Sequence, residues 1–200
     1  MAVKKDSKGW FDSGTHVAFA VALLLVLIMA AWFGLSYNGL VKADVDVDAS
    51  WGQVEVVYQR RADLIPNLVA TVEGAKNFEQ ETLLAVTRAR TGWNDAGTPE
   101  EKVVAANQLE AATKSFIDVV VERYPEIKST QNFLALQDEL ASTENKVAVE
   151  RGRYNEAVRR YNTKVRAFPT NIVAGISGFG QRTFFEASKG AENAPQVNFS

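Results

Sequence analysis

The feature that most constrains this chain is a run of nineteen residues without a charged side chain, from Val17 to Leu35. As a helix rising about 1.5 Å per residue, the run is roughly 28 Å long, close to the hydrocarbon thickness of a bilayer. Aromatic residues, which favour the headgroup level, lie at or near its two ends: Trp10, Phe11, Trp32 and Tyr37. The sequence therefore predicts a membrane-spanning helix at residues 15–37 that contacts the lipid bilayer.

Two other interpretations compete with a retained anchor. A buried core helix is apolar on one face, whereas this run is apolar around its whole circumference. A cleaved signal peptide has a shorter apolar stretch, about 7–15 residues, that ends at a site of small residues. Here Trp32 and Phe33 interrupt the small residues, and Gly34-Leu35-Ser36 matches a cleavage site only weakly. We therefore favour retention as an anchor.

The flanking charges predict the orientation of this helix. Lys4, Lys5 and Lys8 precede the run, and only Lys42 closely follows it. Because basic residues favour the cytoplasmic side, residues 1–14 are expected to form a cytoplasmic tail, with the remaining chain outside the cytoplasm.

Composition excludes several classes of function. The 200 residues contain no cysteine, which rules out disulfides, thiolate metal sites and cysteine nucleophiles. The single histidine, His16, lies beside the apolar run, away from any soluble domain. A net charge of −2 does not suit a nucleic-acid partner. We expect no enzyme activity, no catalytic residue, no metal and no cofactor.

Beyond Leu40 the apolar residues recur at steps of three and four, as on a helix packed against other helices. The stripe contains Val47, Trp51, Val54, Tyr58, Arg61, Ile65, Leu68 and Val72. Aspartate and valine alternate from Asp44 to Asp48, which is also typical of a strand, but the sequence offers no second strand to pair with it. Pro66 lies in phase with the stripe, which favours a kinked helix continuing to about Arg90 over a turn at Pro66.

Two further helices are expected. The first begins at Thr98-Pro99-Glu100-Glu101, which fits a capping box, and ends at Pro125. The second opens near Ser129 and ends at Pro169. The predicted fold class is all-α: a transmembrane helix followed by an elongated antiparallel three- to four-helix bundle, with coiled-coil-like packing, over residues 38–168. A segment containing glycine and phenylalanine and a flexible tail would follow at 169–200.

Two ligand motifs are incomplete. Asp44, Asp46, Asp48 and Glu55 have EF-hand spacing, but Ala49 replaces the glycine that the loop needs. The glycines from Gly175 to Gly180 lack the Lys-Ser/Thr of a phosphate loop. An acidic helix and a hinge are the simpler interpretations.

Arg61 is the most informative polar residue, because it occupies a position of the stripe where an apolar side chain is expected. A buried charge costs several kcal/mol unless it is paired. We expect a polar network that either fixes helix register or lines a ligand groove: Arg60, Arg61, Asp63, Asn67, Glu144, Asn145, Arg151, Asn155 and Asn162. A second candidate contact surface, of exposed apolar residues, contains Ile176, Phe179, Phe184 and Phe185.

These stretches together resemble the LemA family of bacterial membrane proteins. The matches include Tyr37-Asn38, the string from Arg60 to Val69 (RRADLIPNLV), Tyr124-Pro125, Thr143-Glu144-Asn145, Tyr154-Asn155, Tyr161-Asn162 and Phe168-Pro169. The resemblance implies a single-pass protein of the bacterial inner membrane with an extracytoplasmic helical bundle and no established enzymatic activity. We expect an interaction or assembly module whose partner is a membrane protein or a second copy. The alternative is a ligand sensor that uses the groove near Arg61.

Overall fold

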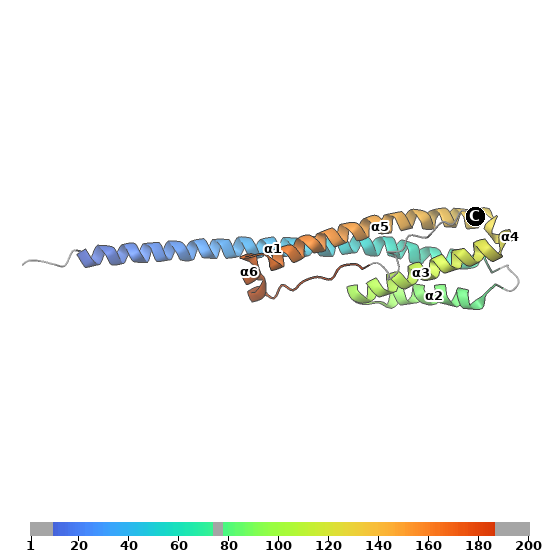
Figure 1. Ribbon diagram of the computed structural model, residues 1–200, viewed down its shortest axis with the longest axis horizontal. Helices are drawn as coiled ribbons and strands as arrows, with labels where there is room; N and C mark the ends of the chain where they lie inside the picture. Colours follow the sequence, from blue (N-terminus) through green and yellow to red (C-terminus); the bar gives the residue numbers. More distant parts are fainter. Residues whose placement is uncertain (1–9, 74–77, 187–200) are drawn as a thin grey trace, which may run out of the picture. The chain divides into compact units, whose positions relative to one another are not determined.

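The computed structural model describes residues 10–73 and 78–186, and it describes side chains within those ranges from Thr15 onward. The described chain is helical and contains no strand, so the predicted all-α class is confirmed (Figure 1). Its helices are α1 (Trp10–Ala70), α2 (Gln80–Asp95), α3 (Pro99–Arg123), α4 (Pro125–Lys128), α5 (Gln131–Arg166) and α6 (Thr170–Ser177).

Helix α1 is 61 residues long and contains both the apolar run and the core stripe without a break. The prediction that the helix continues through Pro66 is confirmed. The prediction that it continues to about Arg90 is wrong, because α1 ends at Ala70 and α2 is a separate helix. The alternation from Asp44 to Asp48 lies within α1, so these residues form neither a strand nor a calcium-binding loop.

The end of α1 has a local cause. Pro66 has no backbone N–H to donate to the Ala62 carbonyl, so one helical hydrogen bond is missing one turn before the helix ends at Ala70. The Thr71 hydroxyl then donates to the Leu68 carbonyl (2.6 Å), and the Val72 N–H bonds to the Val69 carbonyl (3.1 Å). In the sequence, Gly74 follows soon after the last apolar residue of the stripe, a common signal for a helix end.

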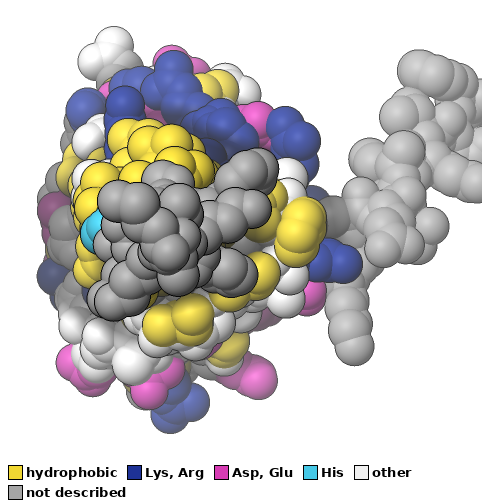
Figure 2. Space-filling view, turned by 90° about the vertical axis from the view of Figure 1, so that its left-hand side faces the viewer, with side chains coloured by type: hydrophobic (Ala, Val, Ile, Leu, Met, Phe, Trp, Pro, Cys, Tyr) yellow, Lys and Arg dark blue, Asp and Glu magenta, His cyan; other side chains and the backbone are white. Residues whose placement is uncertain are grey.

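The amino-terminal half of α1 is exposed and apolar. Within the described residues, α1 is the helix long and apolar enough to cross a membrane, and none of its most apolar stretch is buried. Figure 2 looks onto this end of the molecule and shows hydrophobic side chains on more than one side of it. A core helix would bury these side chains, so the exposure argues against the core-helix interpretation.

The described residues divide into two compact units, and α1 contributes to both. The first unit contains residues up to Val45 together with 161–181, and the second contains 46–160 together with the residues from Arg182 onward.

The second unit is a four-helix bundle in which α1, α2, α3 and α5 run alternately in opposite directions (Figure 1). Every helix contributes large buried side chains to its core. They include Val47, Val54, Tyr58, Ile65 and Leu68 of α1, Trp93 of α2, Leu109 and Phe116 of α3, and Phe133 and Leu140 of α5. The stripe predicted for α1 therefore faces the core.

Helix α3 begins as the sequence predicts. The Glu101 N–H donates to the Thr98 hydroxyl (3.2 Å), and the Thr98 N–H donates to the Glu101 carboxylate (3.1 Å), which completes the capping box. Hydrogen bonds from the Gly97 and Thr98 backbone lower the pKa of Glu101, so this carboxylate stays charged at the positive end of the helix dipole.

The first unit packs α6 against α1. Val173 and Ala174 of α6 and Leu40 of α1 are fully buried together, with Trp32, Val165 and Phe179 around them. Gly178 ends α6 with a positive φ of 76°, which a residue with a side chain rarely adopts. This turn brings Phe179 edge-on to Tyr37, with ring centroids 5.6 Å apart. The flexible tail predicted at residues 189–200 lies outside the described residues.

Candidate functional site

Arg61 is buried in the bundle, with 2% of its surface exposed. Its Nη2 lies 4.0 Å from Oε2 of Glu144, a carboxylate that is itself 64% exposed. Within the described part of the chain, Nε and Nη1 of Arg61 have no hydrogen-bond partner. A guanidinium has five N–H donors, so a single long ion pair leaves most of its hydrogen-bonding capacity unused.

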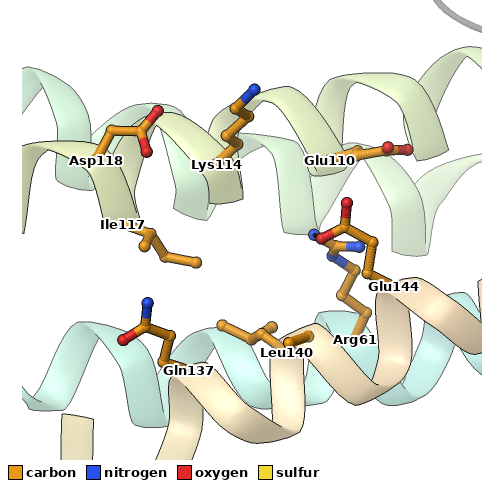
Figure 3. A pocket seen from close by; sticks show the side chains of 9 residues that line it. Arg61, Glu110, Lys114, Ile117, Asp118, Gln137, Leu140 and Glu144 are labelled. Atoms are coloured by element: carbon orange, nitrogen blue, oxygen red, sulfur yellow. Dashed lines mark ion pairs between the residues drawn. The ribbon is translucent and has the colours of Figure 1, made fainter. Parts of the chain in front are cut away.

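Arg61 lines a cavity of about 330 Å³ between α3 on one side and α1 and α5 on the other. The other lining residues are Glu110, Lys114, Ile117 and Asp118 of α3 and Gln137, Leu140, Ala141 and Glu144 of α5. In Figure 3, the charged ends of Arg61 and Glu144 lie together, and Ile117 points toward Gln137 and Leu140. The cavity thus combines a buried cation, several carboxylates and an apolar wall.

Glu110 connects this cavity to a second polar cluster around Arg151. Nη2 of Arg151 lies 2.5 Å from Oε2 of Glu110 and also donates to the Tyr58 hydroxyl and to Asn107 Oδ1 (3.4 Å). The Tyr58 hydroxyl in turn donates to Glu110 Oε2 (3.4 Å). Burial raises the pKa of Tyr58 far above its usual value of 10, although the charge of Arg151 opposes the shift, so Tyr58 remains a neutral donor.

The segment after α6 is held against the same cluster. The Phe185 ring stacks on Tyr58 with centroids 6.1 Å apart, and the Arg151 guanidinium lies 4.3 Å from the Phe185 ring centroid. Asn155 makes two hydrogen bonds to the Phe185 backbone, to its carbonyl (3.0 Å) and from its N–H (2.8 Å). The Tyr154 hydroxyl donates to the Thr183 carbonyl (2.9 Å). These contacts fix an extended segment without regular secondary structure.

The residues expected to form one polar network are distributed over separate contacts. Arg60 pairs with Glu139 (2.5 Å) on an exposed face, and Asp63 accepts a hydrogen bond from Gln59 (2.9 Å). Exposed Asn67 lines a different cavity, which also contains Asn132. Asn145 is exposed, and Asn162 is buried in the first unit. The structure therefore brings together only Arg61 with Glu144, and Arg151 and Asn155 around Phe185.

The four residues of the predicted apolar contact surface also differ from one another. Ile176 and Phe184 are exposed, whereas Phe179 is half-buried against Tyr37. The expectation that Phe185 is exposed is wrong, because its ring fills the space between Tyr58, Trp51 and Arg151. Glu110 and Lys114 were not identified from the sequence. They lie four residues apart on α3, a spacing at which polar residues in a sequence usually indicate a solvent-exposed helix face.

Replacing Arg151 with Met is expected to lower the free energy of unfolding by about 1–3 kcal/mol, because Glu110 and Tyr58 lose a charged hydrogen-bond donor and Phe185 loses its cation contact. Urea unfolding of the full chain in vesicles measures this change. Arg153→Met on the same helix is the matched control, since the exposed Arg153 pairs with Glu150 one turn away, and it is expected to change stability by less than about 0.5 kcal/mol. Equal effects of the two variants would contradict the structural role of the Arg151 cluster.

Comparison with known proteins identifies the family. The sequence model of the LemA family matches residues 50–199. Magnetosome protein MamQ 2 of Paramagnetospirillum magneticum is 26% identical over 91% of this chain and 76% of its own length. Protein LemA of Metamycoplasma hominis is 22% identical over 76% of this chain and 69% of its length, and MamQ of Magnetospirillum gryphiswaldense is 23% identical over 91% and 76%. The chain is a member of the LemA family.

Proposed function

We propose that this protein is a membrane-anchored helical module that binds other molecules outside the cytoplasm without transforming them chemically. The observation that carries the proposal is the structure of α1, in which an exposed apolar half continues into the half that builds the bundle core. An exposed apolar surface of this length is stable in lipid and unfavourable in water. Residues 15–37 are the proposed span, residues 38–168 the bundle, and residues 169–200 the carboxyl-terminal segment that follows it.

The residue types support a binding role over catalysis. The chain has no cysteine, and its one histidine, His16, precedes the apolar run. The carboxyl pKa values of Glu101 and Glu156 are both lowered. Backbone hydrogen bonds lower that of Glu101, and a hydrogen bond from Arg159 lowers that of Glu156. A general acid near neutral pH requires a raised carboxyl pKa, so neither group suits that task.

The proposed location is the bacterial inner membrane, with the amino terminus in the cytoplasm. Three lysines before the span against one after it support this orientation. The partner is proposed to be a membrane protein or a second copy of the chain.

The orientation can be tested directly because the natural chain has no cysteine. A Val149→Cys variant of the full chain in spheroplasts is expected to react with a membrane-impermeant maleimide, since Val149 is exposed on α5. Lys8→Cys is the control and is expected to react only after the membrane is permeabilised. Labelling of Lys8→Cys alone in intact spheroplasts would reverse the orientation, and release of labelled protein from the membrane would refute the anchor.

The binding role predicts a discrete neighbour in the membrane. A photo-crosslinking residue at Val56, Val104, Leu134 or Val149, all exposed apolar positions of the bundle, is expected to give a defined covalent adduct in intact membranes. The matched control is the same residue at the buried position Leu109, which contacts only the bundle interior. Mass spectrometry then distinguishes a second copy from another protein. Absence of an adduct at all four exposed positions would contradict the proposal.

A second candidate function, ligand sensing, is supported by the buried guanidinium of Arg61 beside an open cavity. The charge suits a carboxylate, the nearby Glu110, Asp118 and Glu144 suit an ammonium group, and Ile117 with Leu140 suits an apolar body. A small zwitterion with an apolar side chain, such as a free branched-chain amino acid, combines these features.

Replacing Arg61 with Met separates a ligand-binding role from a structural one. A buried charge retained for binding costs stability, so Arg61→Met is expected to raise the free energy of unfolding by about 1–2 kcal/mol, because exposed Glu144 loses little. Free leucine at saturation is expected to raise the melting temperature of the natural chain but not of the variant. Arg60→Met, which changes an exposed pair, is the control. Destabilisation by Arg61→Met, with no effect of leucine on the natural chain, would instead assign Arg61 to helix register.

A further inference from the structure

Helix α6 lies beside the part of α1 where the apolar run ends. Its buried face, Val173 and Ala174, packs with Leu40 of α1, and Trp32 of α1 packs against the same cluster. Trp32 precedes the end of the apolar run at Leu35 by three residues, or about 4.5 Å along a helix. Leu40 follows Leu35 by five residues, or about 7.5 Å. The contact between α6 and α1 therefore extends to both sides of the expected boundary between hydrocarbon and headgroups.

The exposed side of α6 carries two large apolar side chains, next to the polar Asn171. Ile172 and Ile176 lie four residues apart, hence on one side of the helix, and are 50% and 72% exposed. Phe168, just before α6, is 81% exposed. A short surface helix in water normally presents polar side chains on its outer face, whereas a helix that is apolar on both faces requires a second apolar environment.

Three basic residues belong to the same unit as α6. Lys164 and Arg166 occupy the last turn of α5, both are exposed, and the Lys164 ammonium donates to the Gly39 carbonyl of α1 (3.2 Å). Lys42 is exposed one turn further along α1. Within residues 38–45 and 161–181 together, the charged side chains are these three cations and Asp44. Apolar side chains next to cations are the pattern of a helix that binds an anionic membrane surface.

We propose that α6 is a second membrane contact: it lies at the headgroup level beside the α1 span, inserts Phe168, Ile172 and Ile176 among the lipids, and binds anionic headgroups through Lys164 and Arg166. This inference rests on the proposed membrane anchoring by α1. The buried Val173 and Ala174 attach α6 to α1, so the first unit meets the bilayer through two elements.

The test uses the full chain with single cysteines, each labelled with an environment-sensitive fluorophore, in vesicles of phosphatidylcholine and phosphatidylglycerol that contain a doxyl-labelled quencher lipid. The label at Ile176→Cys is expected to be quenched several-fold more strongly than the label at Val149→Cys, an exposed apolar position on α5 in the second unit. Replacing phosphatidylglycerol by phosphatidylcholine is expected to reduce the quenching at Ile176.

A third label, at Leu25→Cys within the apolar run, separates this proposal from the anchoring on which it rests. Quenching at Leu25 together with quenching at Ile176 supports the second contact. Quenching at Leu25 with no more quenching at Ile176 than at Val149 overturns it and leaves the anchor intact, as expected if a protein partner covers the α6 face. Absence of quenching at Leu25 overturns the anchor itself.

A charge variant tests the headgroup contact. Lys164→Gln combined with Arg166→Gln is expected to reduce quenching at Ile176 in vesicles containing phosphatidylglycerol and to have little effect in phosphatidylcholine alone. The matched control removes two exposed cations of the same helix in the second unit, Arg153→Gln with Arg160→Gln, and is expected to leave the quenching unchanged. Equal loss in both pairs would refute specific binding by Lys164 and Arg166.

Discussion

The structure depends on the continuity of α1, a single helix from Trp10 to Ala70. A segment in lipid must satisfy every N–H and C=O group within itself, and a helix does so without contributions from neighbouring elements. The same helix then presents a stripe from Val47 to Leu68 to the bundle core. One element therefore has exposed apolar side chains along its first half and buried ones along its second. This change of environment along a single helix is the basis of both the anchoring and the bundle.

The sequence predicted the helices well where local spacing decides them. The steps of three and four along α1 identified its buried face, and Thr98 with Glu101 identified the start of α3. The error concerned the end of α1. Ile65, Leu68 and Val72 stay in phase through Pro66, and that continuity obscured the helix end at Ala70. The periodicity of apolar residues indicates which face a helix buries. It does not indicate where one helix ends when the next helix continues the same pattern.

The candidate site was less predictable than the fold. The position of Arg61 in the stripe indicated its burial, and the structure has it buried. Its neighbours across the cavity, Glu110 and Lys114, depend on how α3 is rotated and shifted against α1 and α5. Those quantities follow from packing among three helices and are not encoded in the spacing of any single one. The burial of Phe185 was unpredictable for the same reason. Phe185 lies in a segment without periodicity, and its contacts are with residues far away in the sequence.

In the second unit, Glu110 belongs to both the Arg61 cavity and the Arg151 cluster. Its carboxylate lines the Arg61 cavity and also binds Arg151, which contacts the ring of Phe185. A cationic group bound at Glu110 would compete with Arg151 for that carboxylate. Arg151 would then retain Tyr58, Asn107 and the Phe185 ring as neighbours, so the hold on the extended segment would weaken without being lost. If the cavity bound such a group, its occupation would therefore affect the segment that follows α6 through two adjacent contacts, Glu110 with Arg151 and Arg151 with Phe185.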